Sequence, residues 1–341
     1  MTAVYSDDRC LAHVVPGHPE RPERMSAALE GLRESGLQLE WPEVFPADAS
    51  ILELAHTPQH VRQIQALAQQ GSGWIDPDTF VVEASFIAAS LAAGAATQAV
   101  SDVVAGRQKN ALVVVRPPGH HASEDRAMGF CLLNNAAVAT RAAMRGQGVK
   151  RMAIVDIDVH HGNGTQNIFY TDPSVLYCST HQYPFYPGTG ALTETGRGAG
   201  EGATLNIPLM AGCGDDSYAA VTEHALVPAL RRFDPECLLV SVGFDAHWAD
   251  PLAGMQLSVN GYIDVLQRLL EVADEVCDGR VVFLLEGGYD LDVLKNGVAA
   301  SARLLAGGGK RADALGAAAP GAEPADVPRV LEAVQIIHRL I

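Results

Sequence analysis

Five short apolar runs, separated by longer stretches of helical composition, constrain the fold of this chain more than any other feature. Each run is rich in β-branched residues and lacks polar alternation, as strands covered on both faces do. The runs are 111–115, 152–155, 175–178, 237–242 and 281–285. Helices are expected at about 83–105, 134–146, 216–232, 258–276 and 290–305. This alternation predicts an α/β fold with a parallel sheet and helices on both faces.

The chain is expected to form a single domain over residues 1–306, followed by two shorter segments. Residues 307–328 are rich in Ala, Gly and Pro, which predicts a surface linker. Residues 329–341 are predicted to form a short helix that packs back onto the same domain. We find neither an apolar run long enough to span a membrane nor a secretory signal, so no membrane partner is expected.

Composition bounds the location and the partners of the protein. The six cysteines are scattered without a CxxC pair, which favours a reducing cytoplasm over a disulfide framework or a thiolate metal site. Asp and Glu number 40 against 24 Lys and Arg, giving a formal charge of −16. This balance argues against nucleic-acid binding and favours cationic substrates, although it would serve solubility equally well. The sequence leaves assembly into a homo-oligomer open.

Dense polar clusters directly follow four of the five predicted strands. They are Arg-Pro-Pro-Gly-His-His (116–121), Asp-Ile-Asp-Val-His-His-Gly (156–162), Gly-Phe-Asp (243–245) and Glu-Gly-Gly-Tyr (286–289). Ligands of open α/β sheets bind at the carboxyl ends of the strands. The four clusters are therefore expected to converge at one edge of the sheet.

The second cluster carries the ligands of a candidate metal site. Asp156, Asp158 and His160 alternate, so in an extended chain their side chains would point to the same side. Asp158 and His160 can bind one divalent cation together with Asp245 from another strand, which leaves an open position for catalysis. Zinc is expected, although carboxylates with one imidazole would also accept Fe²⁺ or Co²⁺.

The tandem histidines His120 and His121 are the candidate proton-transfer groups. One imidazole could accept a proton from the attacking water while the other stabilises charge or protonates the leaving amine. Each needs an orienting partner, and the candidates are Asp156 for His120 and Asn163 for His121. Tyr289 follows two glycines that allow close backbone approach, and its phenol could donate a hydrogen bond to an oxyanion.

In this order, the motifs resemble those of the histone deacetylase and acetylpolyamine amidohydrolase superfamily, and most of all the class II deacetylases and their bacterial homologues. The resemblance runs from residues 17–24 to about Leu305 and includes Gly-Phe-Cys (129–131) and Asp-Pro-Leu (250–252). It implies an arginase-like α/β fold with a single eight-stranded parallel sheet. It also implies a zinc-dependent hydrolase that removes acetyl or other short acyl groups from lysine-like amines.

The resemblance further implies a role for individual residues. Those matched to the zinc ligands are Asp158, His160 and Asp245, and those matched to the catalytic groups are His120, His121, Asp156, Asn163 and Tyr289. Those matched to substrate binding are Gly129, Phe130, Tyr186, Leu252 and Gly288, with Arg24 near the exit of the acetate product. A structural K⁺ site is matched by Asp156, Asp158, His160, Ser179 and Thr180, and part of a second site by Phe169, Asp172 and Val175.

Three positions depart from other members of that superfamily. Asn163 stands where class I members carry Asp, and Tyr186 stands where many members carry Phe. Leu252 stands where a polyamine-selective relative carries a Glu that reads the second ammonium of its substrate. The last departure weakens the case for acylated polyamines as substrates without removing it.

Three alternatives to lysine deacylation stay open at this point. They are an acetylpolyamine amidohydrolase, a non-catalytic acyl-lysine-binding protein, and a ureohydrolase-like enzyme with two manganese ions. The binding protein predicts a degraded site, whereas the metal ligands, both histidines and the tyrosine are all present. The residues needed for a second catalytic metal are not evident from the sequence.

Overall fold

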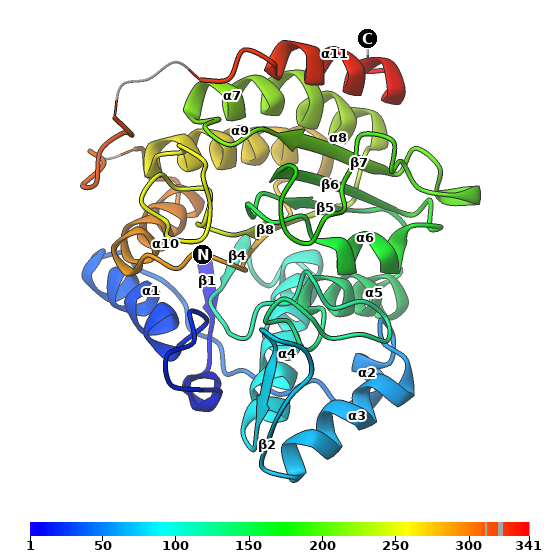
Figure 1. Cartoon of the computed structure of the whole chain (residues 1–341), viewed down its shortest axis with the longest axis vertical. Coiled ribbons are helices and arrows are strands. Elements are labelled where there is room, and N and C mark those ends of the chain that lie inside the picture. The colour runs from blue at the N-terminus through cyan, green and yellow to red at the C-terminus, as the bar shows by residue number, and fades with distance from the viewer. Residues whose placement is uncertain (311, 320–322, 341) are drawn as a thin grey trace.

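A seven-stranded parallel sheet forms the centre of the protein (Figure 1). The computed structural model describes residues 1–310, 312–319 and 323–340. The strands follow the order β1-β4-β9-β8-β5-β6-β7, and all neighbouring pairs are parallel. Their bounds are β1 (Thr2–Tyr5), β4 (Asn110–Val113), β5 (Met152–Asp156), β6 (Val175–Gln182), β7 (Thr204–Leu209), β8 (Cys237–Val242) and β9 (Val281–Leu285).

The two strands that the apolar runs did not predict, β1 and β7, are the edges of this sheet. Neither forms a clear apolar run, because β1 has only four residues and β7 contains polar residues. In β7 the order Thr-Leu-Asn-Ile alternates between polar and apolar residues. An edge strand tolerates Pro208, which has no N–H, because no second neighbouring strand needs that donor.

The expected eighth strand is not formed within the described residues. Beyond β1 the chain makes a single parallel bridge between Ala3 and Glu40. The N–H of Val4 donates to the carbonyl of Glu40 at 2.8 Å, and the N–H of Glu40 donates to the carbonyl of Thr2 at 3.1 Å. Pro42 follows two residues later and has no N–H to continue a ladder, so the pairing stops there.

The five predicted helical stretches are helical in the structure. Four of them form α4 (Ser85–Val104), α5 (Asn135–Gln147), α9 (Val259–Cys277) and α10 (Leu291–Leu305). The stretch 216–232 forms α7 (Asp215–Val221) and α8 (Val227–Phe233), joined by a π-helical turn, η3 (Thr222–Leu226). Helices without a prediction are α1 (Pro22–Glu34), α2 (Ala49–Leu52), α3 (Pro58–Gln69) and α6 (Asn163–Phe169). Two short 3₁₀ turns, η1 (Asp8–Ala12) and η2 (Gly198–Gly200), and a hairpin, β2 (Ser72–Trp74) with β3 (Phe80–Val82), complete this part.

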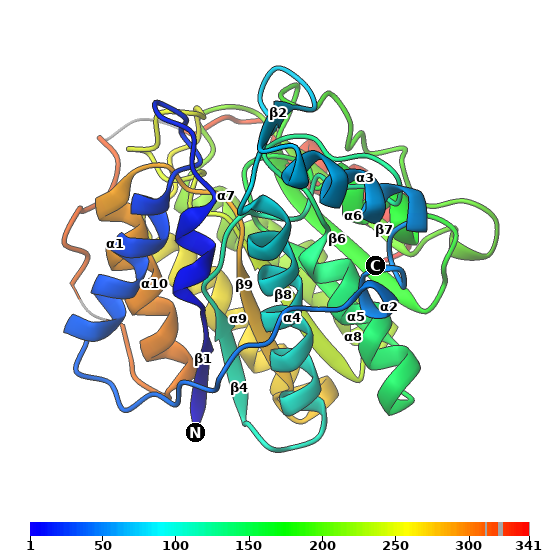
Figure 2. The same ribbon diagram turned by 90° about the horizontal axis from the view of Figure 1, so that it is seen from below.

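Helices cover both faces of the sheet (Figures 1 and 2). On one face α4 contacts β1, β4 and β9, and α5 packs beside it. On the other face lie α9 and α10, with α1 packed outside α10 and α8 against α9. The sheet is therefore buried between two helical layers, which explains why β4, β5, β8 and β9 consist mostly of apolar residues.

Helix α4 differs from the expectation that no segment is long and apolar enough to span a membrane. By length and composition alone this helix passes that test. However, 67% of its apolar window is buried inside the fold, where α4 packs against the sheet and against α5. Its many alanines allow this close packing, so the hydrophobicity of α4 is explained by its place in the core.

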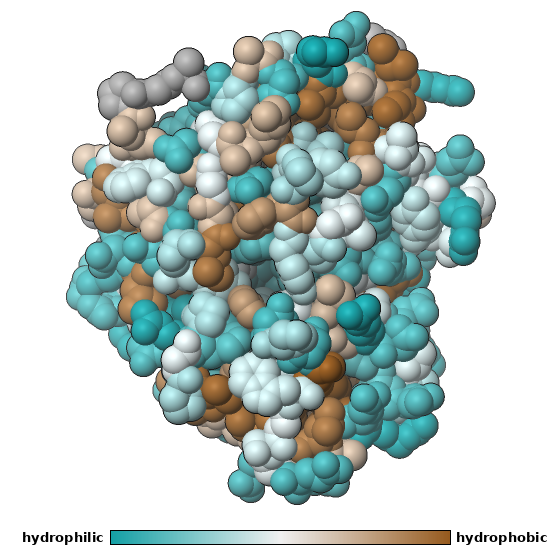
Figure 3. All heavy atoms as spheres, in the orientation of Figure 1, coloured by the Kyte–Doolittle hydropathy of each residue, from teal (hydrophilic) through white to brown (hydrophobic). Residues whose placement is uncertain are grey.

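The C-terminal part begins with residues that form neither helix nor strand where they are described, and ends in α11 (Val327–His338). Helix α11 contacts β7 and α7. Residues 311 and 320–322 of the predicted linker, and residue 341 of the predicted terminal helix, lie outside the described residues. Hydrophobic atoms gather on the surface at this end of the molecule, where Ile336 is 62% exposed (Figure 3).

Replacing His13 by Gln should make the stability of the fold less sensitive to mild acid. His13 stacks on Phe80 with ring centroids 4.2 Å apart, and burial lowers the pKa of this imidazole to about 4. The unfolded chain, with a histidine pKa near 6.5, therefore binds this proton more readily, and the contribution of His13 to stability is lost as the pH falls below about 6.5.

Urea unfolding at pH 7.5 and 5.5 measures this effect. When the pH is lowered from 7.5 to 5.5, the free energy of unfolding of the wild type should fall by about 1 kcal/mol more than that of H13Q. The other titrating groups are common to both proteins, so their effects cancel in this difference. Equal losses in both proteins would contradict the assignment.

Candidate active site

Four neighbouring strands bring the polar clusters to one edge of the sheet. Strands β4, β9, β8 and β5 lie side by side in that order, and because they are parallel their carboxyl ends align. The loops beyond these strands carry the tandem histidines, Tyr289, Asp245, and the pair Asp158 and His160. The convergence that the sequence predicted is thus found in the structure.

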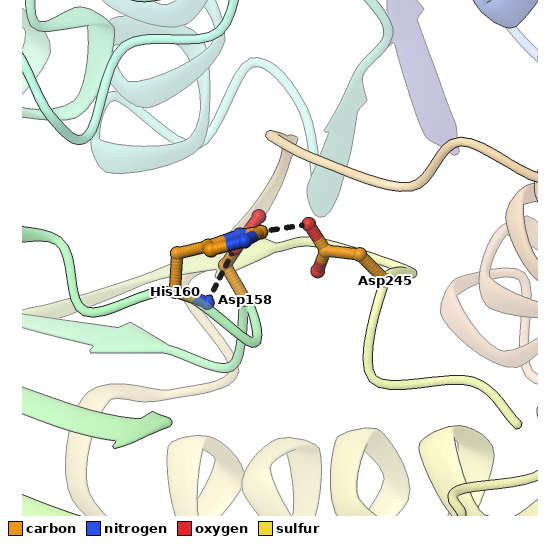
Figure 4. A group of neighbouring side chains, drawn as sticks. All are labelled: Asp158, His160 and Asp245. Atoms are coloured by element: carbon orange, nitrogen blue, oxygen red, sulfur yellow. Dashed lines mark hydrogen bonds and ion pairs between the residues drawn. The ribbon is translucent and has the colours of Figure 1, made fainter. Parts of the chain in front are cut away.

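Asp158, His160 and Asp245 form a compact group (Figure 4). One possible ligand atom from each residue lies within 4.8 Å of the other two. The Nδ1 atom of His160 is 3.2 Å from Oδ1 of Asp158 and 3.3 Å from Oδ2 of Asp245. Both carboxylates are fully buried. The three side chains could therefore bind one metal ion between them.

The loop after β5, and not the strand itself, aims these side chains. Strand β5 ends at Asp156, so the expectation that Asp158 and His160 alternate within an extended chain was wrong. Instead, the backbone N–H of Asp158 donates to Oδ1 of Asp156 at 3.2 Å, and that of His160 donates to Oδ1 of Asp158 at 2.9 Å. The N–H of Val159 donates to Oδ1 of Asp245 at 3.0 Å, which ties the two loops together.

The electrostatics of this group fit a divalent cation. Burial, and then the charge of Asp158, raise the pKa of Asp245 above its ordinary range. Among the described residues, Oδ2 of Asp245 has no hydrogen-bond donor apart from its 3.3 Å contact with Nδ1 of His160. Buried carboxylates in contact need a compensating positive charge, which a metal ion would provide. The described residues contain this single group of three or more His, Cys, Asp or Glu in such an arrangement.

Two glycines allow the carboxylates to approach each other. A Cβ atom at Gly243 would overlap Oδ2 of Asp158, and one at Gly287 would overlap Oδ2 of Asp245. The N–H of Gly287 also donates to Oδ2 of Asp158 at 2.8 Å. Any larger residue at these two positions would displace a candidate metal ligand.

The tandem histidines lie beside this group and have the partners expected from the sequence. The ring centroids of His120 and His121 are 4.0 Å apart, and that of His121 is 6.1 Å from His160. Nδ1 of His120 lies 3.0 Å from Oδ2 of Asp156, and Nδ1 of His121 lies 2.8 Å from Oδ1 of Asn163. With both Nδ1 atoms engaged, Nε2 is the nitrogen that each ring has available for a substrate.

The two imidazoles differ in their affinity for a proton. Burial alone would lower the pKa of His120, but the carboxylates of Asp156 and Asp158 raise it to about 10. Burial lowers the pKa of His121 well below its ordinary value, and the rings of His120 and His160 lower it further. These shifts favour a proton on His120 and disfavour one on His121, so His121 is the ring better suited to accept a proton.

Glu286 is a buried support that the sequence analysis recognised only as part of a motif. Its Oε2 accepts hydrogen bonds from the backbone N–H groups of Gly119 at 2.7 Å and His120 at 3.2 Å. Its Oε1 accepts from the hydroxyl of Ser241 at 3.0 Å. One carboxylate therefore fixes the loop of the tandem histidines to the ends of β8 and β9. Its position at the start of Glu-Gly-Gly-Tyr was the available signal.

Asp250 and Tyr177 are two further supports that had no assigned role. The carboxylate of Asp250 accepts from the N–H of Tyr289 at 2.7 Å and from that of Leu252 at 2.9 Å. The hydroxyl of Tyr177 donates to Oδ2 of Asp156 at 3.2 Å. Asp250 lies in the Asp-Pro-Leu motif, whereas nothing in the sequence around Tyr177 distinguishes it from a core residue.

A cavity of about 90 Å³ opens onto these groups. It is lined by Asp78, Pro118, His120, His121, Gly129, Phe130, His160, Tyr186, Leu252, Gly287 and Tyr289. The ring of Tyr186 is 5.2 Å from that of His121, and the ring of Phe130 is 5.9 Å from that of Tyr289. Of the lining residues, Asp78 had no motif signal in the sequence.

Gly288 and Arg24 lie behind the cavity instead of lining it. Nε of Arg24 donates to the carbonyl of Gly288 at 2.6 Å, and a second guanidinium nitrogen donates to the carbonyl of Glu286 at 2.6 Å. The guanidinium carbon lies 4.8 Å from the centre of the Tyr289 ring. The substrate contact of Gly288 and the product-exit role of Arg24 both stay predictions.

The residues matched to the first monovalent cation site lie close to the metal ligands. Ser179 on β6 is the register partner of Asp156 on β5, and Thr180 follows it. The buried hydroxyl of Thr180 has no hydrogen-bond partner among the described residues. The second set consists of Phe169, Asp172 and Val175, which lie where α6 connects to β6. Both cation sites stay predictions.

Replacing Gly287 by Ala should weaken metal binding by about tenfold or more, because the new Cβ would push the two carboxylates apart. Titration of the metal-stripped protein with Zn²⁺ measures this affinity. The matched control is G146A in α5, where a Cβ meets no atom within 4 Å. Wild-type affinity in G287A would show that these side chains do not bind the ion.

Known proteins are similar to this chain in both sequence and architecture. Residues 18–305 match the sequence profile described as the histone deacetylase domain. A probable deacetylase of Archaeoglobus fulgidus is 42% identical over 297 residues, which cover 86% of this chain and 82% of that protein. The polyamine deacetylase HDAC10 of Homo sapiens is 40% identical over 324 residues, which cover 89% of this chain and 48% of that protein. The crystal structure of the HDA15 HD domain matches with a TM-score of 0.91 at 37% identity, covering 99% of this chain and 94% of that chain.

Proposed function

This chain belongs to the histone deacetylase family, and from that premise we propose that it uses one zinc ion to remove short acyl groups from lysine-like amines. The family and the named relatives show an amide hydrolase of the deacetylase kind. The ion and the substrate are our proposal. The observation that carries it is the group of Asp158, His160 and Asp245 beside a cavity that His121 and Tyr289 line.

Two carboxylates and one imidazole leave an open position on a four-coordinate ion, as catalytic zinc sites do. When bound, such an ion supplies a Lewis acid for the substrate carbonyl and makes water a stronger nucleophile at neutral pH. Fe²⁺ and Co²⁺ could use the same three ligands. We include structural K⁺ near Asp156, Ser179 and Thr180 in the proposal, supported by the unpartnered hydroxyl of Thr180.

The tandem histidines would carry out the proton transfers. His121 is neutral, so its Nε2 can accept a proton as water attacks the carbonyl carbon, and can then deliver that proton to the leaving amine nitrogen. His120, held as a cation by Asp156 and Asp158, would stabilise the negative charge that develops on the substrate. The neutral Asn163 suits this division because its hydrogen bond raises the pKa of His121 less than the charge of a carboxylate would.

Tyr289 would donate a hydrogen bond to the carbonyl oxygen as charge develops on it. Burial raises the pKa of this phenol well above its ordinary value, so it stays protonated and remains a donor. Asp250 fixes the backbone of Tyr289, and the guanidinium of Arg24 lies over its ring. The donor is therefore already in position before substrate enters, which is the arrangement that makes such groups effective.

The cavity walls favour an acylated aliphatic amine. The rings of Phe130 and Tyr186 offer apolar surface on which the methylene chain of an acyl-lysine could pack. The carbonyl of Gly129, in the same wall, would accept a hydrogen bond from the N–H of the scissile amide.

The protein would act in the cytoplasm, and this location is supported by six cysteines that are all unpaired and buried.

An acylated polyamine is the second candidate substrate. It is favoured by the net charge of −16 and by the similarity to a relative named as a polyamine deacetylase. Leu252, however, gives the cavity wall an apolar side chain that cannot pair with a second ammonium group.

We therefore expect a higher kcat/KM for an acetyl-lysine peptide than for N-acetylputrescine when both are measured under the same conditions. The reverse order would assign the polyamine instead.

Replacing Tyr289 by Phe should lower kcat by about 10²–10³, as expected for the loss of one oxyanion donor. Steady-state hydrolysis of an acetyl-lysine peptide measures this. The control is Y170F, which removes the same hydroxyl from a residue that caps α6 and does not line the cavity. An unchanged kcat in Y289F would reject the role of the phenol.

Removing the metal with a chelator should abolish hydrolysis, and adding back Zn²⁺ should restore it, with about one ion bound per chain. Elemental analysis and acetate release measure the two quantities. The variant D245N should bind the ion poorly because it loses one charged ligand. A protein that binds acyl-lysine but releases no acetate when loaded with zinc would support the non-catalytic alternative.

A further inference from the structure

The wall of the cavity contains a strained turn. Met128 and Cys131 exchange two backbone hydrogen bonds of 3.1 and 2.9 Å, and Gly129 and Phe130 lie between them at φ +55° and +69°. Positive φ at both central positions is typical of a type I′ turn, which favours Asn-Gly and disfavours a bulky residue. Phe130 therefore adopts a costly conformation, and such conformations persist only where the surroundings hold them.

One buried imidazole joins both ends of the loop that carries this turn. Nδ1 of His56 donates to the carbonyl of Ser123 at 2.9 Å, and Nε2 of His56 accepts from the backbone N–H of Asn134 at 2.8 Å. This pattern requires a neutral ring with its hydrogen on Nδ1. His56 is 3% exposed, and no step of the mechanism above uses it.

Two further hydrogen bonds come from the same segment, at the start of α3. The backbone N–H of Thr57 donates to the carbonyl of Glu124 at 2.8 Å, and Nε2 of His60 donates to the carbonyl of Leu132 at 2.8 Å. The rings of His56 and His60 are 5.0 Å apart, and both are buried. Four bonds from residues 56–60 thus hold the loop close to its first and last residues.

The far end of the loop is also fixed to the next helix. Oδ1 of Asn134 accepts from the N–H of Ala137 at 2.9 Å and so caps α5, while Nδ2 donates to the carbonyl of Ala122 at 2.9 Å. Ala122 directly follows His121 in the chain. The loop base is therefore held between α3 and α5, and the turn is the part that reaches the cavity.

We propose that His56 and His60 are positioning residues: with Thr57 they form a clamp that holds the Gly129-Phe130 turn in its strained conformation and so sets the shape of the substrate cavity. The inference rests on the proposed function, because the turn sets substrate affinity only if the chain of an acylated amine packs against it in the cavity. A purely structural pair would support folding and leave the affinity for substrate unchanged.

The test compares H56F with H56Q. Phe keeps the volume of the ring and removes both hydrogen bonds, whereas the Gln amide offers one donor and one acceptor like the neutral imidazole. With an acetyl-lysine peptide, KM of H56F should rise about tenfold with a smaller change in kcat, since the wall contacts ground state and transition state alike. H56Q should restore KM to near the wild-type value, and bound metal should be equal in all three proteins.

A second measurement does not depend on catalysis. Amide hydrogen exchange at Met128 and Cys131 should be about tenfold faster in H56F than in the wild type, because the turn loses the support that keeps its hydrogen bonds closed. The control is H338F: His338 is a buried histidine on α11, away from the loop, and its loss should change neither KM nor this exchange. Should H56F fail to fold, H60L removes one bond of the clamp and should raise both quantities about threefold.

The outcomes separate the two proposals. If the wild type is active and KM and exchange are unchanged in H56F, or if kcat alone falls with the folded fraction, the clamp is rejected. If the zinc-loaded wild type hydrolyses none of the amides, the proposed function fails. In that case faster exchange in H56F still supports the clamp, and unchanged exchange rejects it.

Discussion

The close approach of two buried carboxylates, Asp158 and Asp245, is the constraint on which the rest of this site depends. Like charges in a low-dielectric interior repel each other strongly, and each carboxylate also loses its hydration there. The protein offsets part of this cost with backbone N–H donors from Val159 and Gly287, and with the imidazole of His160. What remains is a demand for positive charge, and that demand makes the site selective for a cation.

The catalytic groups are held by backbone contacts more than by each other. Glu286 fixes the loop of the tandem histidines through the N–H groups of Gly119 and His120, and Asp250 fixes Tyr289 in the same way. Each carboxylate spans two loops that follow different strands or segments of the chain. Since the loops are joined at their bases, the side chains that meet the substrate need little reorganisation when it binds.

The sequence predicted the sheet centre, the main helices and the metal group because these depend on local patterns. Runs such as 281–285 are apolar throughout since both faces of the strand are covered. The edge strands were missed because β1 is short and β7 alternates polar with apolar residues. The eighth strand is reduced to one bridge because Pro42 cannot continue the ladder. The alternation of Asp156, Asp158 and His160 pointed to side chains that do lie close together, although a loop and not an extended chain aims them. The supports Tyr177 and His56 could not be recognised, because their roles arise from contacts between distant segments.

The separation in sequence between the two acidic residues also affects how the protein folds. Asp158 and Asp245 come together only after β5 and β8 have paired. These strands are neighbours in the sheet, although α6, α7, α8 and two other strands separate them in the sequence. Such non-local pairing forms slowly, since loop-closure entropy is lost before any contact compensates for it. The cation site is therefore expected to form late in folding. An ion bound there would stabilise the folded protein and would not nucleate folding.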